Sequence, residues 1–386
     1  MMILTITLLG CEQKNDRLYL ASAKQISCLI DRYYQIRSDS LYVETYPYKK
    51  DLNVTYLADN NNNDKKEKAA YLWPLSGLLS SHVALYKAKH DQSILYKIKK
   101  QIIPVMDKYY NPDKTYPCYM SYLKEEGFSD SFYDDNIWIA IDYCDLYKAT
   151  NNRYFLCRAE KLWRFIISGW DENLNGGIYW YERRRKTKNT CSNAPACVLA
   201  CKLYQATNRT DYLNKAIDIY NWTQSNLQDS SDNLYWDNVD LQGKVDTRKY
   251  AYNSGQMIQS GALLYQITGE KRYLNDAHVI ASSAMDHFTR EKQIEDKKIK
   301  IFEGDNNWFI AVLIRGYCEL YMIDKNYQYI DIIKRNCDWL LKMRRDDNGL
   351  FEKDWYHEEI RESHKWLMDQ ASIMEIFARI YEINKQ

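Results

Sequence analysis

The 386-residue sequence lacks a charge imbalance, because 53 lysines and arginines face 52 aspartates and glutamates and leave a net charge of +1. It has no basic stripe and no RNA-binding motif, so nothing in it indicates a nucleic-acid partner. Beyond the first residues it also lacks an apolar run long enough to cross a bilayer. The chain is nevertheless 46% hydrophobic and can bury a sizeable core.

The ten cysteines lack the spacing of a disulfide framework or a metal site. Nine remain once Cys11 is set apart, and most lie within helical patterns as small apolar residues. Cys197 and Cys201 share a helix face near Cys191, but a zinc site needs more ligands at closer spacing. We therefore expect no metal and no cofactor.

One loop leaves a calcium site open as an alternative. Asp171, Asn173 and Asn175 alternate before Gly176, and Glu182 follows six residues after that glycine, which satisfies the EF-hand pattern. The segment after the glycine is β-prone and not helical, and the sister loops lack the pattern. The sequence favours a glycine-rich turn over a calcium loop.

The N-terminus has the apolar residues 3–9 followed by Leu8-Leu9-Gly10-Cys11 at the boundary to a polar stretch. This arrangement resembles a bacterial lipoprotein signal, which implies that residues 1–10 form a signal peptide and that Cys11 becomes lipidated. Residues 11–386 would then form a single domain attached to the cell envelope, at the outer-membrane surface or in the periplasm. The alternative is a fortuitous apolar start.

A repeat of about 60 residues runs through the rest of the chain. Tyrosines in similar phrases ("DLYKAT", "KLYQAT", "LLYQIT") recur at steps of 61, 57, 61, 56 and 60 residues. Each phrase ends one helical pattern, and a short turn then leads into another. The expected helices lie near 17–37, 69–88, 92–110, 132–149, 152–169, 192–206, 210–227, 252–267, 270–289, 307–323, 326–344 and 366–382.

Six such hairpins can stack as an open solenoid or close as a ring. Because the last copy ends near the C-terminus and the first begins soon after Cys11, we predict an all-α (α/α)6 barrel. β-Prone phrases at 171–180, 230–238 and 345–355 predict short hairpins or extended loops. The long connections all precede the even-numbered helices, so they gather at one end of the barrel, where we expect the functional site.

The even-numbered helices begin with clusters of amides, acids and aromatic residues, whereas an ordinary helix start needs a single cap. Asp134 could act as such a cap, but the adjacent Asp135 in "FYDDNIW" is not needed for capping. Consecutive helical residues lie about 100° apart with a rise of about 1.5 Å, so both carboxyl groups can reach one bond. Their separation could approach the roughly 5–5.5 Å of retaining glycosidases.

The two carboxyl groups need different pKa values for that chemistry. Asp134 lies nearer the helix start and is better stabilised as an anion, which suits a nucleophile. The neighbouring charge and the nearby aromatic rings favour a protonated Asp135, which suits a general acid/base. The helix dipole opposes this difference, because it lowers both pKa values.

Four stretches, 133–141, 176–182, 189–207 and 250–269, together with "DQAS" at 369–372, resemble glycoside hydrolase family 76, the α-1,6-mannanases. The resemblance spans roughly 70–380. It implies an (α/α)6 barrel that cleaves internal α-1,6-mannosidic bonds with retention, using Asp134 as nucleophile and Asp135 as general acid/base, without a cofactor. The expected substrate-binding residues are Trp73, Tyr133, Asn136, Asn193, Tyr252, Asn253, Asn307, Trp308, Asp369 and Gln370.

Three other hypotheses remain open at the level of sequence. A transglycosylase would use the same site on α-mannosyl glycans but transfer the sugar to another glycan. A helical glycan-binding lipoprotein would have no need for the paired acids, and neither would a protein-binding helical repeat. A closed ring needs no partner, so we expect a monomer.

Overall fold

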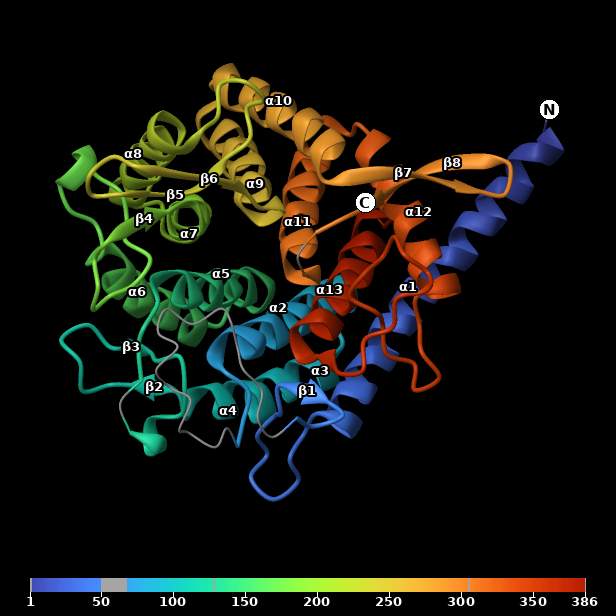
Figure 1. The fold of residues 1–386 in the computed structure, drawn as a ribbon, viewed down its shortest axis with the longest axis horizontal. Helices are drawn as coiled ribbons and strands as arrows, with labels where there is room; N and C mark the ends of the chain where they lie inside the picture. Colours follow the sequence, from blue (N-terminus) through green and yellow to red (C-terminus); the bar gives the residue numbers. More distant parts are fainter. Residues whose placement is uncertain (1, 50–67, 128, 305, 386) are drawn as a thin grey trace.

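The computed structural model describes residues 2–49, 68–127, 129–304 and 306–385, with the side chains of residues 2–16 excepted. Within these ranges the chain forms a ring of helices in two layers, and Figure 1 shows the inner layer surrounding a common axis. The inner helices are α2 (Leu72–Lys89), α5 (Tyr133–Thr150), α7 (Thr190–Thr207), α9 (Ala251–Thr268), α11 (Asn307–Asp324) and α13 (Leu367–Ile383). The outer helices are α1 (Met2–Tyr33), α3 (Gln92–Lys97) with α4 (Ile103–Asp107), α6 (Arg153–Ile167), α8 (Thr210–Leu227), α10 (Lys271–His287) and α12 (Gln328–Met343).

The two layers differ in how their side chains are buried. Every residue of α7 from Thr190 to Cys201 is buried, as expected for a helix enclosed on all sides. In α6 the buried residues follow the three- and four-residue spacing of one apolar face, from Phe155 through Ala159 and Leu162 to Ile166. The inner helices α13 and α2 close the ring by packing against each other, which confirms the predicted (α/α)6 barrel.

The recurring tyrosine marks the last turn of the inner helices. The residue four positions after it adopts a left-handed conformation and donates its backbone N–H to the tyrosine carbonyl, as at Asn151, Asn208 and Gly269. The threonine of the same phrase donates its hydroxyl to the carbonyl four residues back; Thr150 bonds the Leu146 carbonyl at 2.6 Å. The sequence repeat thus marks the end of the inner helices α2, α5, α7, α9 and α11, whereas α13 ends without this cap.

Short strands form the long connections at the other end of the barrel. They pair as β1 (Thr45–Tyr46) with β9 (Lys365–Trp366), β2 (Tyr110–Asn111) with β3 (Cys118–Tyr119), and β7 (Thr289–Ile294) with β8 (Lys297–Phe302), all antiparallel. The strands β4 (Thr187–Asn189), β5 (Trp236–Asp240) and β6 (Val245–Lys249) form one three-stranded sheet. The expected extended loops each contain an antiparallel bridge, as between Trp170 and Ile178.

Two predicted helices differ from the structure. The helix expected at 92–110 is divided by a π-helical turn, Ile98–Ile102, because Pro104 in the first turn of α4 cannot donate a backbone hydrogen bond. The helix expected at 17–37 extends over Met2–Tyr33. The Cys11 side chain lies outside the described residues, so its lipidation and the proposed cleavage remain predictions. None of the described helices is long and apolar enough to span a membrane.

Candidate active site

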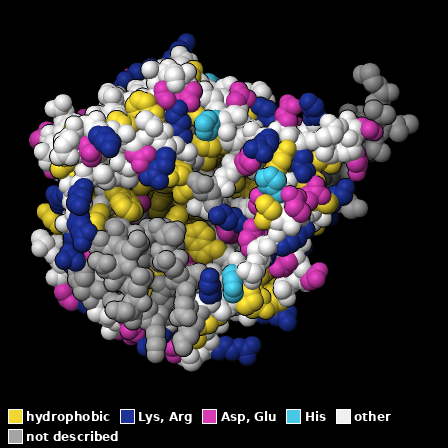
Figure 2. Space-filling model, viewed as in Figure 1, with side chains coloured by type: hydrophobic (Ala, Val, Ile, Leu, Met, Phe, Trp, Pro, Cys, Tyr) yellow, Lys and Arg dark blue, Asp and Glu magenta, His cyan; other side chains and the backbone are white. Residues whose placement is uncertain are grey.

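A pocket of about 440 Å³ opens at the end of the barrel where the connections gather. Figure 2 shows the corresponding face of the molecule hollowed, with hydrophobic side chains at the hollow. First turns of the inner helices and the sheet β4–β6 supply its walls. The residues that line it are Tyr71, Trp73, Ser121, Phe132, Asp134, Asp135, Trp138, Trp180, Thr187, Asn189, Cys191, Asp237, Asn238, Arg248, Tyr250, Tyr252, Trp308 and Phe309.

Asp134 lies in the first turn of α5 and is held by several donors. The Trp180 indole N–H donates to its Oδ2 at 3.0 Å, and the Asp135 backbone N–H donates to its Oδ1 at 3.0 Å. The Cys191 thiol, from the neighbouring helix α7, is a third hydrogen-bond donor. Burial raises the pKa of Asp134 to about 6, and these donors oppose that rise by stabilising the anion.

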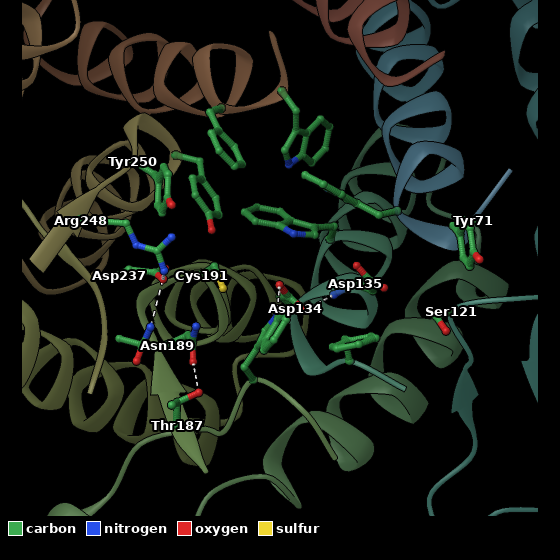
Figure 3. A pocket seen from close by; sticks show the side chains of 18 residues that line it. Tyr71, Ser121, Asp134, Asp135, Thr187, Asn189, Cys191, Asp237, Arg248 and Tyr250 are labelled. Atoms are coloured by element: carbon green, nitrogen blue, oxygen red, sulfur yellow. Dashed lines mark hydrogen bonds and ion pairs between the residues drawn. The ribbon is translucent and has the colours of Figure 1, made fainter. Parts of the chain in front are cut away.

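Asp135 has a different environment, although it is adjacent in sequence. Asp135 is 9% exposed, and no donor among the described residues makes a hydrogen bond to its carboxyl group. Burial and the charge of Asp134 raise its pKa well above the usual range of an aspartate. Both carboxyl groups face the same pocket (Figure 3). The donors favour the anion at Asp134, whereas burial and the neighbouring charge favour the protonated form of Asp135.

Aromatic rings form a second wall of the pocket. Tyr252 and Phe309 stack with centroids 4.1 Å apart, and Tyr250 and Trp73 lie 5.3 and 6.2 Å from the Phe309 ring. Stacked rings with polar edges offer an apolar surface to a hydroxylated ligand and still allow hydrogen bonds. Trp73, Tyr252 and Trp308 were expected at the site from the sequence, and the structure brings them into the pocket with the two aspartates.

Several lining residues were missed because they come from the hairpins and not from the helix starts. Asp237 and Asn238 lie on β5 and Arg248 on β6; Arg248 Nη2 is 3.6 Å from Asp237 Oδ2. Asp237 is buried, which raises its pKa. Cys191 and Asn189 are exceptions, because they lie at the start of α7 within the stretch 189–207, where the sequence predicted only Asn193 as a substrate contact.

Four predicted substrate-binding residues lie outside the pocket wall, and three of them hold the backbone of the preceding segment. Asn136 accepts from the Tyr119 N–H at 2.8 Å and donates to the Tyr119 carbonyl at 3.0 Å. Asn193 makes the same pair of bonds to Ile178, and Gln370 makes them to Phe351. The Tyr133 ring stacks on Phe165, and its hydroxyl accepts from Arg185. The side chains of Tyr133, Asn136, Asn193 and Gln370 are thus engaged within the protein and do not line the pocket, and their contact with substrate stays a prediction.

Three further predicted residues are buried behind the wall. Asn253 and Asn307 lie on α9 and α11, and their side-chain amides have no hydrogen-bond partner among the described residues. Asp369 Oδ1 accepts the Asn307 backbone N–H at 3.0 Å, and Asp369 lines a smaller neighbouring cavity instead of the main pocket. The helix starts are therefore correctly placed around the site, but only some of their side chains face it.

The loop with the calcium pattern encloses a lysine. Lys188 is fully buried, and its ammonium group donates to Asp171 Oδ1 at 2.7 Å, to the Asn173 carbonyl at 2.6 Å and to the Gly176 carbonyl. A lysine cation thus occupies the oxygen cage that a calcium ion would need, which decides against the calcium alternative. Among the described residues, no three or more histidine, cysteine, aspartate or glutamate side chains group in a way that could hold a metal ion.

Known proteins with a similar sequence or fold include glycoside hydrolases. The sequence profile of glycosyl hydrolase family 76 matches residues 44–384. A family 76 mannosidase of Bacteroides thetaiotaomicron superposes with a TM-score of 0.85 at 29% identity, covering 95% of this chain and 99% of that chain. An α-mannanase of the same organism superposes with a TM-score of 0.82 at 26% identity, covering 95% and 96%.

A curated relative gives a weaker match. The mannan endo-1,6-α-mannosidase DCW1 of Saccharomyces cerevisiae is 27% identical over 146 residues, which is 33% of this chain and 32% of the relative. The match thus spans about a third of that relative's length. The profile match and the full-length superpositions carry the assignment: the chain belongs to glycosyl hydrolase family 76 and is a glycoside hydrolase.

Proposed function

We propose that this enzyme hydrolyses internal α-1,6-mannosidic bonds of mannan with retention of configuration. The single observation that carries the proposal is the pair Asp134–Asp135, whose carboxyl groups share one pocket but differ in their stabilisation. Relatives named mannosidase and mannan endo-1,6-α-mannosidase support the choice of substrate. The open pocket, walled by aromatic rings, is suited to a polymer that enters along its length.

Asp134 is the nucleophile in this proposal. Its carboxylate forms a bond to the anomeric carbon of the sugar as the bond from that carbon to the leaving oxygen breaks. The donors Trp180 and Cys191 keep Asp134 ionised and orient it before the reaction. A carboxylate that already accepts several hydrogen bonds requires little rearrangement to attack.

Asp135 is the general acid and then the general base. It donates its proton to the leaving oxygen in the first step, which its raised pKa permits near neutral pH. In the second step it removes a proton from water, and this water attacks the anomeric carbon and releases Asp134. Two displacements at one carbon restore the original configuration.

The pair is tested with linear α-1,6-mannan and with branched yeast mannan as substrates. We expect short oligosaccharides from the wild type, and a loss of at least about 10³-fold in kcat for both Asp134→Asn and Asp135→Asn. NMR of the first product should show the α-anomer before mutarotation. Branched mannan shows whether side chains block the pocket.

Each other outcome has a distinct meaning. A β-anomeric first product would contradict Asp134 as a covalent nucleophile and indicate direct attack by water. Products that grow when a sugar acceptor is added would indicate a transglycosylase. Binding without cleavage by all three proteins would indicate a glycan-binding protein without chemistry.

We also propose that Cys11 carries a lipid that holds the enzyme at the cell envelope, at the outer-membrane surface or in the periplasm. The support is the Leu8-Leu9-Gly10-Cys11 sequence after an apolar run. Cells that express the full chain should incorporate labelled palmitate into the protein and release it only with detergent. The Cys11→Ser variant should lose the label, and an unlabelled wild-type protein would contradict the anchor.

A further inference from the structure

A second, smaller cavity of about 160 Å³ lies beside the main pocket. Strand β9, the start of α13 and the preceding segment 351–364 enclose it. Its lining consists of Phe351, Lys353, Glu362, His364, Lys365, Trp366 and Asp369. The combination of one indole ring and several hydrogen-bonding groups is typical of a site for a hydroxylated ligand.

The two cavities share a partition of aromatic residues. The Trp366 ring in the smaller cavity meets the Trp73 ring of the main pocket edge to face, with centroids 5.4 Å apart. Asp369 in the smaller cavity bonds the backbone N–H of Asn307, and Trp308 next to it lines the main pocket. The Trp73–Trp366 contact thus places the two cavities on either side of one pair of rings.

The smaller cavity has no excess of positive charge, because Glu362 and Asp369 line it together with Lys353 and Lys365. Lys365 is buried and bonds Glu352 and the Glu362 carbonyl, so its charge is neutralised within the protein. The buried Asp369 adds a carboxyl group, whereas Lys353 is exposed and has no ion-pair partner among the described residues. This balance provides donors and acceptors for hydroxyl groups without the excess of positive charge that a phosphate or carboxylate ligand would need.

We propose that this cavity is an additional subsite that binds an uncharged sugar residue of the same polysaccharide chain, remote from the bond that is cut. The Trp366 ring packs against the sugar, and Lys353 and Asp369 bond its hydroxyl groups. The inference rests on the proposed function, and it makes chain length a determinant of specificity. Substrates long enough to reach this subsite are cleaved faster than shorter ones.

The experiment compares kcat/KM over a series of linear α-1,6-manno-oligosaccharides of increasing length. For the wild type we expect kcat/KM to rise with length and then level off. Lys353→Ala removes an exposed ammonium group with no ion-pair partner among the described residues, so it should fold normally. It should lose about tenfold on the longest substrates, as expected for one hydrogen bond to a charged group, and nothing on the shortest.

Trp366→Ala is the second variant and should show the larger loss on long substrates. Lys297→Ala is the matched control, because Lys297 is also an exposed lysine and lies at the tip of the β7–β8 hairpin. An equal loss on all lengths in the Trp366 variant, or an unchanged profile in the Lys353 variant, would overturn the subsite. A wild type that cleaves none of the oligosaccharides would instead overturn the proposed function, and the subsite with it.

Discussion

Asp134 and Asp135 show how two identical neighbouring residues acquire different environments. The helix start alone stabilises both anions, so the difference must come from partners outside the helix. Trp180 and Cys191 approach Asp134 from other parts of the chain and stabilise its anion. Asp135 is buried beside the charge of Asp134, and both effects raise its pKa. The pair itself was visible in the sequence, but these partners were not, because 46 and 57 residues separate them from Asp134.

Cys191 is the residue on which we base a first prediction. Cys191→Ala removes a donor to Asp134, so the pKa of Asp134 should rise above its present value of about 6. Because the nucleophile must be ionised, the acid limb of kcat/KM should move to higher pH, by about half to one unit for one hydrogen bond. A pH–rate profile between about pH 4 and 8 measures this shift.

Two variants separate the loss of the donor from the loss of volume. Cys191→Ser keeps a donor at the same position, so the acid limb of its kcat/KM profile should lie at the same pH as in the wild type. Cys197→Ala removes a buried cysteine two turns further along α7, whose thiol bonds the Ala216 carbonyl, and should leave the limb in place. An acid limb that is identical in all four proteins would show that Cys191 does not influence Asp134.

At the scale of the elements, an amide at the start of an inner helix fixes the preceding hairpin. Asn136, Asn193 and Gln370 each accept from a backbone N–H and donate to the carbonyl of the same residue. An amide side chain suits this role because it has one acceptor and two donors. The sequence could not distinguish such a clamp from a sugar contact, since both place an amide at the same position.

Asn136→Ala should therefore reduce stability before it alters chemistry. It leaves the buried N–H and C=O groups of Tyr119 without their partner, which costs roughly 2–4 kcal/mol of the free energy of unfolding. Urea denaturation monitored by circular dichroism measures this change. Asn221→Ala on the outer helix α8 is the control, because among the described residues its side chain accepts a hydrogen bond only from the exposed Arg272.

The mutant's remaining activity distinguishes the clamp from a substrate contact. If Asn136 only holds the hairpin, the folded fraction of Asn136→Ala should bind mannan with a KM close to that of the wild type. A large rise in KM at unchanged stability would instead support the contact between Asn136 and substrate that the sequence predicts.

At the scale of the whole molecule, the ring could be predicted because its signal is periodic. The recurring tyrosine carbonyl accepts the capping N–H in five inner helices, the threonine hydroxyl bonds one turn back in three of them, and these bonds are local in sequence. The walls of the pocket could not be predicted in the same way. The sheet β4–β6 joins residues 187–189 to residues 236–249, and no short-range pattern indicates which strands pair.

The barrel axis also contains charges that no sequence pattern revealed. Arg315 on α11 makes two hydrogen bonds to Glu375 on α13, at 2.6 and 2.8 Å, and lies against the rings of Trp138 and Trp308 at the pocket. Asp142 on α5 is buried in the same interior and accepts from the Ser80 hydroxyl at 2.6 Å. The interior beneath the site is therefore polar, and the charge of Asp142 within it changes with pH.

Asp142→Asn tests this dependence on the stability of the whole protein. Burial raises the pKa of Asp142 to about 7 against the attraction of Arg315, so the folded protein binds this proton more tightly than the unfolded chain does. Asp142 consequently makes the wild type less stable as pH rises from about 4 to 7, by roughly 4 kcal/mol in total.

In Asp142→Asn, the asparagine keeps the acceptor for Ser80 without the charge. The variant should match the wild type near pH 4 and exceed its free energy of unfolding at pH 8, as measured by urea denaturation at both pH values. A variant that is less stable at pH 8 would show instead that Asp142 is ionised and that its attraction to Arg315 outweighs its burial.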